Sequence, residues 1–127
     1  MSDKLSLEGL VFQATKIDIS NNIITITLNR PEKKNAINNV MMNEINYALA
    51  YAKQERSIRV VVLAAEGDIF CAGADLLFFE SIITNPKELA NYINTLNQVF
   101  FNIENLNIPT VSVVHGFALA GGLELML

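Results

Sequence analysis

Two segments of the sequence could bring main-chain N–H groups to one oxygen atom. In each, a β-branched run (60–64 and 110–114) leads into a small-residue turn (66–75 and 115–124). Small residues let a ligand approach the backbone closely, and N–H groups at the start of a helix carry a partial positive charge. If the turns converge, they supply two donors to an oxygen that gains negative charge, each stabilising the transition state by about 3 kcal/mol.

Glu124 is the acid–base candidate of the second turn. It follows Gly121 by three residues, so its side chain can face the same space as the Gly121 N–H in the helix expected there. The other residues of 123–127 are leucine and methionine, and a carboxylate in such a run must find a partner, become solvated or stay protonated. That makes it a candidate acid or base. For either turn alone, the alternative is that glycines only make the turn and allow close packing.

Cys71 and His115 offer a second, nucleophilic interpretation. One lies beside the first turn and the other beside the second, so a thiol–imidazole pair could form. A free cysteine is more often a small buried hydrophobe, and a lone Cys and His specify a nucleophile weakly. We therefore expect structural roles, with His115 bonded to a backbone group.

Hydrophobic periodicity indicates the elements that must position these turns. Alternating β-branched residues predict a hairpin, apolar residues at helical spacing predict amphipathic helices, and continuous apolar runs predict strands buried on both faces. The expected strands are 11–19, 23–28, 59–64 and 110–114, and the expected helices are 39–55, 86–106 and one that begins near Gly121. Strands separated by helices pair in parallel, which predicts the α/β fold class.

Composition limits the domain count and the partners. The 127 residues, 51% hydrophobic and 17% charged, fit one domain, 1–127, with a real core. The net charge of −4 disfavours nucleic acid, no apolar run is long enough to cross a membrane, and one cysteine allows no internal disulfide. With no signal-peptide pattern, we expect a cytoplasmic protein. The apolar end at 125–127 lies in mid-helix, so we expect an incomplete domain.

Three segments carry a family resemblance. They are Ile-Thr-Leu-Asn-Arg-Pro-Glu-Lys-Lys-Asn-Ala-Ile (26–37), Phe-Cys-Ala-Gly-Ala-Asp (70–75) and Pro-Thr-Val-Ser-Val-Val-His-Gly-Phe-Ala-Leu-Ala-Gly-Gly-Leu-Glu-Leu (109–125). In order and spacing they resemble the enoyl-CoA hydratase/isomerase (crotonase) family, and the likeness covers nearly the whole chain from Val11 onward. The resemblance implies a crotonase-like ββα spiral, truncated before the C-terminal helices. It also implies an acyl-CoA substrate, no metal or separate cofactor, and a homo-oligomer, which is a trimer or hexamer in the full-length family.

By position, the resemblance assigns roles to residues in all three segments. Ala72 and Gly121 would donate N–H groups to an oxyanion hole, and Glu124 would be the first of two glutamates that hydratases of the family use to add water. The residues implied in substrate binding are Gly73, Ala74, Asp75 and Leu76 along the acyl and pantetheine channel, Ala36 and Ile37 beside the CoA moiety, and Lys33 or Lys34 near its phosphates. From the residues alone, Asp75 could be only an N-cap, and the lysines only a solvated loop.

The implied reaction is hydration of a trans-2-enoyl-CoA in fatty-acid or related acyl-CoA metabolism. The two amides would polarise the thioester carbonyl and stabilise the enolate, while Glu124 holds or activates the water. Two departures bear on this reaction. Ala120 stands where many members have a third glycine, and the second glutamate would lie past Leu127, so we expect negligible hydratase activity from the isolated chain. The alternatives are isomerisation or another crotonase-type reaction, and a non-catalytic binding or assembly module.

Overall fold

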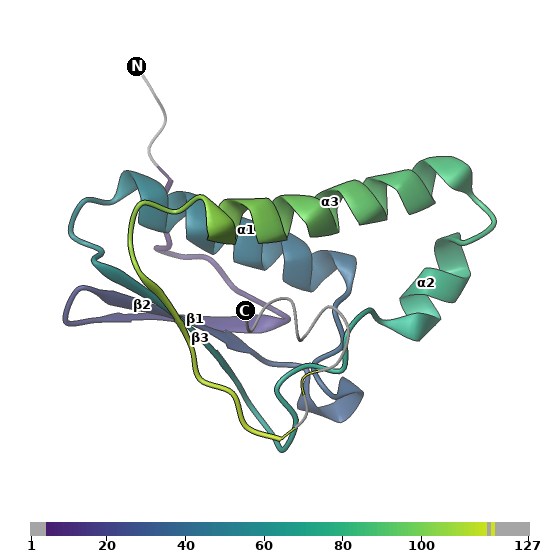
Figure 1. Ribbon diagram of the computed structural model, residues 1–127, viewed down its shortest axis with the longest axis horizontal. Coiled ribbons are helices and arrows are strands. Elements are labelled where there is room, and N and C mark those ends of the chain that lie inside the picture. The colour runs from purple at the N-terminus through teal and green to yellow at the C-terminus, as the bar shows by residue number, and fades with distance from the viewer. Residues whose placement is uncertain (1–4, 117, 119–127) are drawn as a thin grey trace.

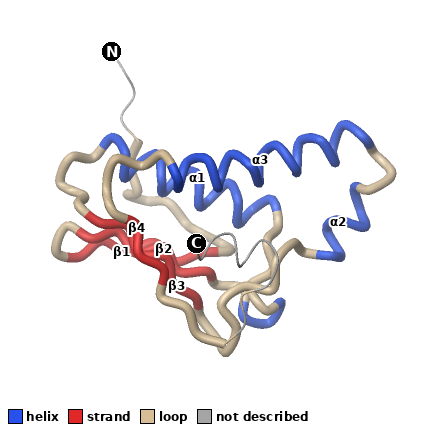
Figure 2. The backbone as a smooth tube through the Cα atoms, in the orientation of Figure 1, coloured by secondary structure: helices blue, strands red, loops and turns tan. Residues whose placement is uncertain are grey.

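A sheet covered on one face by two long helices forms the body of the computed structural model, which describes residues 5–116 and 118. Figure 1 shows helix α1 (Asn39–Gln54) and helix α3 (Pro86–Glu104) side by side above the sheet, and Figure 2 shows the strands as one layer below them. The short helix α2 (Leu76–Ile82) stands at one end of this pair. This arrangement buries one face of the sheet and leaves the strand ends to carry loops.

The sheet combines a hairpin with two parallel crossovers. Its order is β1 (Thr15–Ser20), β2 (Ile23–Leu28), β3 (Val60–Ala65) and β4 (Thr110–Ser112). Strands β1 and β2 are antiparallel, whereas β2–β3 and β3–β4 are parallel because helices intervene in the chain. The hairpin turns at Asn21 and Asn22, both at positive φ, which suits a tight turn that favours asparagine. The predicted α/β class and the parallel pairing are confirmed.

Asparagine side chains cap the N-termini of both long helices. The Asn38 side chain accepts a hydrogen bond from the Met41 N–H at the start of α1, and the Asn85 side chain accepts from Lys87 and Glu88 at the start of α3. The core between α1 and the sheet consists of fully or almost fully buried side chains. They include Ile24, Ile26, Leu28, Met41, Met42, Ile45, Leu49, Val61, Leu63 and Phe70.

The structure differs from the predicted elements at three places. Strand β1 begins at Thr15 rather than Val11, because the N–H groups of Gln13 and Ala14 donate to the Glu44 carboxylate of α1 and not to a neighbouring strand. The segment between β3 and α3, in which no helix was expected, contains α2. The last predicted strand was expected to be buried on both faces, but Val111 of β4 is 47% exposed because β4 is at the edge of the described sheet.

A short 3-10 helix, η1 (Pro31–Lys33), follows β2. It was not predicted from periodicity, because three residues are too few to show a period. The helix expected near Gly121 lies outside the described residues. Among those that are described, no helix is long and apolar enough to cross a membrane.

Candidate active site

The first glycine turn lies between two other segments of the chain. On one side, residues 34–37 bind it through main-chain hydrogen bonds, and a parallel bridge pairs Ile37 with Ala74. On the other side, the Phe70 N–H donates to the His115 carbonyl at 3.1 Å, and a second parallel bridge pairs Cys71 with Ala118. The three segments quoted for the family resemblance therefore meet at the ends of β2, β3 and β4, as parallel strand ends do at one sheet edge.

The contact with residues 34–37 fixes the orientation of one peptide group. The Ile37 N–H donates to the Gly73 carbonyl oxygen at 2.7 Å, and the Asp75 N–H donates to the Ile37 carbonyl oxygen at 2.9 Å. Because peptide bonds here are trans, the Ala74 N–H points in the opposite direction to the Gly73 carbonyl, away from Ile37. Within the described part of the chain, the Ala74 N–H has no hydrogen-bond acceptor. A ligand oxygen could therefore accept from it.

In the structure, the main-chain N–H predicted as the donor of this turn already has an acceptor. The Ala72 N–H, implied as an oxyanion-hole donor, already donates to the Lys34 carbonyl oxygen at 3.0 Å. An N–H that points at a neighbouring segment cannot point at a substrate without breaking that bond. Ala74, two residues further on, has the free N–H instead. The sequence could not decide between them, because Gly73 at a φ of 97° breaks the regular alternation of N–H directions.

A pocket of about 400 Å³, called the loop pocket below, opens beside this amide. That volume is within the usual range for small-molecule sites. Its lining consists of seven residues from two segments: Lys33, Ala36, Ala72, Ala74, Asp75, Leu76 and Leu77. Leu76 and Leu77 are 73% and 67% exposed, so they give the pocket an apolar rim.

Five of the eight residues implied in substrate binding line this pocket, and three do not. Lys33, Ala36, Ala74, Asp75 and Leu76 do. Gly73 is buried and contributes its carbonyl to the contact described above. The side chain of Ile37 is 1% exposed and belongs to the core, so it does not line the pocket. Lys34 is exposed and ends η1 at a φ of 55°.

An ion pair that the sequence analysis did not identify joins the two segments of the pocket. The Arg30 Nη1 lies 2.9 Å from the Asp75 Oδ2, and the two side chains are only 14% and 12% exposed. Asp75 also caps α2, since its Oδ1 accepts from the Phe78 N–H at 3.1 Å, so the N-cap interpretation is confirmed. The available signal was the position of Arg30 directly after an apolar strand, where a charge needs a partner.

These contacts set the charge state of Asp75. Burial alone would raise the pKa of this carboxyl, but the hydrogen bond from Phe78 and the neighbouring Arg30 guanidinium outweigh it. The pKa of Asp75 therefore lies below its ordinary value of 3.8, and the side chain is a carboxylate at neutral pH. An ionised carboxylate that is bound to both Arg30 and the Phe78 N–H suits a role in holding the loop better than a role in proton transfer.

The Cys71–His115 nucleophile pair is not formed. The Cys71 thiol is buried and donates to the Asn35 carbonyl at 3.2 Å, and burial raises its pKa above the ordinary 9.0 despite the hydrogen bond from Gly73. The His115 Nε2 bonds the Gly67 carbonyl oxygen. Each side chain has the structural role expected for it, because a neutral, shielded thiol is a poor nucleophile. Nor do the described residues contain a cluster of His, Cys, Asp or Glu that could hold a metal ion.

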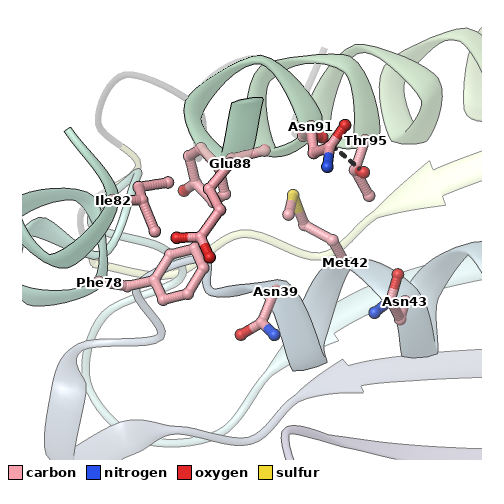
Figure 3. Close-up of a pocket in the computed structure, with 9 residues that line it drawn as sticks. Asn39, Met42, Asn43, Phe78, Ile82, Glu88, Asn91 and Thr95 are labelled. Atoms are coloured by element: carbon pink, nitrogen blue, oxygen red, sulfur yellow. Dashed lines mark hydrogen bonds between the residues drawn. The ribbon is translucent and has the colours of Figure 1, made fainter. Parts of the chain in front are cut away.

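A second pocket, of about 290 Å³, lies on the other side of α2. Figure 3 shows side chains from α1, α2 and α3 around it; the lining is Asn39, Met42, Asn43, Phe78, Ile82, Glu88, Asn91, Tyr92 and Thr95. None of the residues with a predicted chemical role lines it. One of its residues nevertheless contacts the segment 34–37 that binds the first turn, because the Tyr92 hydroxyl donates to the Ile37 carbonyl oxygen at 2.8 Å.

The residues predicted for the other half of the site, Ala120, Gly121 and Glu124, lie outside the described residues, so their roles stay predictions. The described start of the second turn crosses the first turn, with Gly116 directly against the Asp68 carbonyl. The fold and this crossing define a class of α/β protein in which two strand–turn units meet, and the first of them borders a pocket with an available main-chain amide.

Comparison with known proteins identifies the family. The family model for enoyl-CoA hydratase/isomerase matches residues 18–127. "Probable enoyl-CoA hydratase 2, mitochondrial" of Arabidopsis thaliana is 42% identical over 106 residues, and the mouse methylglutaconyl-CoA hydratase is 33% identical over 106 residues. Each alignment covers 83% of this chain. The chain belongs to the enoyl-CoA hydratase/isomerase family.

Solved structures agree with this assignment and define the fold. The enoyl-CoA hydratase of Bacillus anthracis superposes with a TM-score of 0.83 at 28% identity, over 90% of this chain and 44% of that one. The predicted crotonase-like fold is thereby confirmed for the part of it that this chain contains. The chain spans 35% of the Arabidopsis protein and 33% of the mouse protein, so it corresponds to the amino-terminal portion of the family.

One expectation is contradicted by these relatives. The Arabidopsis protein and the enoyl-CoA hydratase domain-containing protein 2 of mouse and human are all named as mitochondrial proteins. The cytoplasmic location expected from the sequence is therefore wrong as a simple assignment. The expectation rested on the absence of a recognisable N-terminal pattern, which carries little information.

Proposed function

We propose that the loop pocket binds an acyl-CoA thioester and that the Ala74 N–H donates a hydrogen bond to its carbonyl oxygen. One observation carries this proposal: the Ala74 amide borders the pocket and has no acceptor among the described residues, whereas the Ala72 amide is engaged with Lys34. A fixed N–H next to a reacting carbonyl stabilises the negative charge that develops there. Lys33, at the same pocket, supplies positive charge for the CoA phosphates.

The reaction favoured is hydration of a trans-2-enoyl-CoA. The oxygen of water bonds to C3 while one O–H bond of that water breaks and an acid–base group takes the proton. The π bond between C2 and C3 breaks to give an enolate, and the enolate takes up a proton at C2. The Ala74 amide stabilises the enolate oxygen, and by resemblance Gly121 is the second donor and Glu124 holds or activates the water. The CoA thioester is the substrate, and the reaction needs no separate cofactor. The hydratase names of the plant and mouse relatives support this choice.

Isomerisation of an enoyl-CoA is the second candidate. A relative from Zymoseptoria tritici, 37% identical over 109 residues, is named an enoyl-CoA isomerase/hydratase. Both reactions pass through an enolate at the same carbonyl, so the described half of the site serves either. Glu124 favours hydration, because the resemblance matches it to a glutamate that hydratases use. Spectroscopic loss of the conjugated enoyl thioester measures hydration, and its formation from a 3-enoyl-CoA measures isomerisation.

The donor assignment is tested by replacing single main-chain amides with esters, which removes one N–H and keeps the side chain. We expect the ester at Ala74 to lower the affinity for crotonyl-CoA about tenfold, as loss of one well-placed hydrogen bond does. Affinity for the matching S-alkyl-CoA thioether, which has no carbonyl, stays unchanged. Calorimetry with both ligands measures the ratio of the crotonyl-CoA affinity to the thioether affinity.

The ester at Ala72 is the matched control. It removes the bond to the Lys34 carbonyl, so it lowers the free energy of unfolding by about 1 kcal/mol and leaves the thioester-to-thioether ratio unchanged. If the Ala72 ester lowers the ratio and the Ala74 ester does not, the donor is Ala72 after all. A chain that binds neither ligand contradicts the acyl-CoA function, and one that binds both but converts neither enoyl substrate is a non-catalytic binding module.

A further inference from the structure

The Arg30 guanidinium begins a hydrogen-bonded chain that ends at the Ala74 N–H. Arg30 Nη1 donates to the Ala36 carbonyl oxygen at 2.6 Å. The N–H of that same peptide group, which belongs to Ile37, donates to the Gly73 carbonyl oxygen at 2.7 Å. The N–H of that second peptide group is the Ala74 N–H. Two planar peptide units therefore connect the cation to the amide beside the loop pocket.

This chain has a direction. A cation at the carbonyl end of a peptide draws electron density toward that oxygen, which makes the N–H at the other end a stronger donor. The effect passes through the Ala36–Ile37 peptide to the Gly73–Ala74 peptide, because each peptide accepts a hydrogen bond at its carbonyl oxygen and is polarised toward that oxygen. The short distances at both junctions and the low exposure of Arg30 limit the screening by water.

The surroundings hold the Arg30 side chain in this position. Asp75 pairs with the guanidinium at 2.9 Å. The main-chain N–H of Arg30 donates to the Asn35 side-chain oxygen at 2.7 Å. Asn35 is fully buried and its Nδ2 donates to the carbonyls of Glu66 and Ile69, so the loop that carries Arg30 is fastened to the first turn. The carboxylate of Asp75 is itself shared with the Phe78 N–H, so it does not belong to Arg30 alone.

We propose that Arg30 is a positioning residue that aligns and polarises the Ala74 N–H through the Ala36–Ile37 and Gly73–Ala74 peptides. This inference rests on the proposed function, because it assigns a purpose to that amide. Arg30 does not line the loop pocket, so it acts through these peptides. Its effect is therefore specific for ligands that carry a carbonyl oxygen at the amide, and absent for ligands that lack one.

The test is the Arg30→Met variant, which keeps most of the side-chain length and removes the charge and the donors. In the wild-type chain we expect crotonyl-CoA to bind about tenfold tighter than the S-alkyl-CoA thioether. In Arg30→Met we expect this preference to fall below about threefold, with thioether affinity unchanged. The carbonyl stretch of bound, ¹³C-labelled thioester, measured by difference infrared spectroscopy, should shift back toward its value in water.

Controls separate positioning from folding. Lys16→Met removes a cation from the exposed ion pair with Glu66 and should leave the preference and the carbonyl stretch unchanged. Arg30→Lys restores a cation and should recover part of the thioester preference and part of the shift in the carbonyl stretch. If Arg30→Met does not fold because Asp75 is left buried and unpaired, the double variant Arg30→Met/Asp75→Asn removes both charges and is measured in the same way.

The outcomes distinguish this inference from the proposed function. If the wild-type chain shows no preference for the thioester, the proposed function fails. If the wild-type chain shows the preference and the carbonyl shift, and a folded variant without Arg30 retains both, the proposed function stands and the role of Arg30 is refuted. If both ligands lose affinity equally in Arg30→Met, Arg30 is merely structural, which also refutes the inference.

Discussion

The carboxylate of Asp75 connects three parts of the candidate site. It pairs with Arg30, caps helix α2 at the Phe78 N–H, and lines the loop pocket. These contacts give the group a buried and specific environment, which is expected of a residue on which the geometry of a site depends. Because its contacts favour the ionised form, Asp75 also makes the stability of the protein depend on pH.

We predict that Asp75 stabilises the fold above its ordinary pKa and loses this effect in acid. The folded-state pKa lies below 3.8, so at intermediate pH the unfolded chain binds more protons at this group than the folded chain does. The free energy of unfolding then rises with pH. The contribution is complete above the unfolded pKa and is lost as the pH falls through the folded pKa.

Chemical unfolding of the wild type and of Asp75→Asn, measured from about pH 2 to pH 6, checks this. The difference in unfolding free energy between the two should be large and constant at the upper end of this range and should shrink toward the lower end. Asp18→Asn, which removes an exposed carboxylate of β1, controls for the loss of one charge. A difference for Asp75→Asn that grows in acid would contradict the prediction.

The way in which the two strand–turn units cross is decided by one glycine. Gly116 has a φ of 63°, and a Cβ atom there would lie 1.9 Å from the Asp68 carbonyl oxygen. The second turn therefore passes against the backbone of the first with no room for a side chain. This close crossing is what allows the Cys71–Ala118 bridge immediately beyond it.

We predict that Gly116→Ala lowers the free energy of unfolding by about 3 kcal/mol or more, because strain at positive φ adds to a clash with backbone. Gly9→Ala is the matched control. Gly9 has a φ of 71°, but a Cβ atom added there would meet nothing within 4 Å, so only the conformational cost of about 1 kcal/mol applies. Urea unfolding of both variants measures the two values. Equal losses in the two variants would show that the crossing is not tight.

The surface of the whole chain carries apolar side chains that no described residue covers. Val111 and Val113, at and just after the edge strand β4, are 47% and 53% exposed. Exposed β-branched side chains at the edge of the described sheet form an apolar surface, and such a surface favours association. The homo-oligomer implied by the family resemblance stays a proposal, and this surface is a place at which copies of the chain could meet.

We predict that the chain self-associates as its concentration rises, and that the double variant Val111→Thr/Val113→Thr associates less. Threonine keeps the strand propensity and removes apolar area. Ile83→Thr, at a side chain 50% exposed between α2 and α3, is the control for a general loss of apolar surface. Sedimentation or multi-angle light scattering measures the mass. A wild-type chain that stays monomeric, or a double variant that associates like it, would contradict the prediction.

The sequence alone determined the longer elements, their order and the family. Alternating and helical periods are local properties, so β2, α1, β3 and α3 were predicted close to their observed bounds, whereas β1 begins later than predicted. Five of the residues implied in substrate binding line the loop pocket, and their role in binding stays a prediction. The short elements η1 and α2 were missed, since they contain too few residues to show a period.

Only the tertiary structure decided which atoms of these motifs are available for chemistry. The choice between Ala72 and Ala74 depends on which N–H already has an acceptor, and that acceptor comes from Lys34, far away in sequence. The pairing of Arg30 with Asp75 and the burial of Ile37 likewise depend on contacts across the chain. A residue type fixes what a group can donate or accept. The direction of a main-chain N–H is fixed by the fold, because a peptide plane rotates until its hydrogen bonds are satisfied.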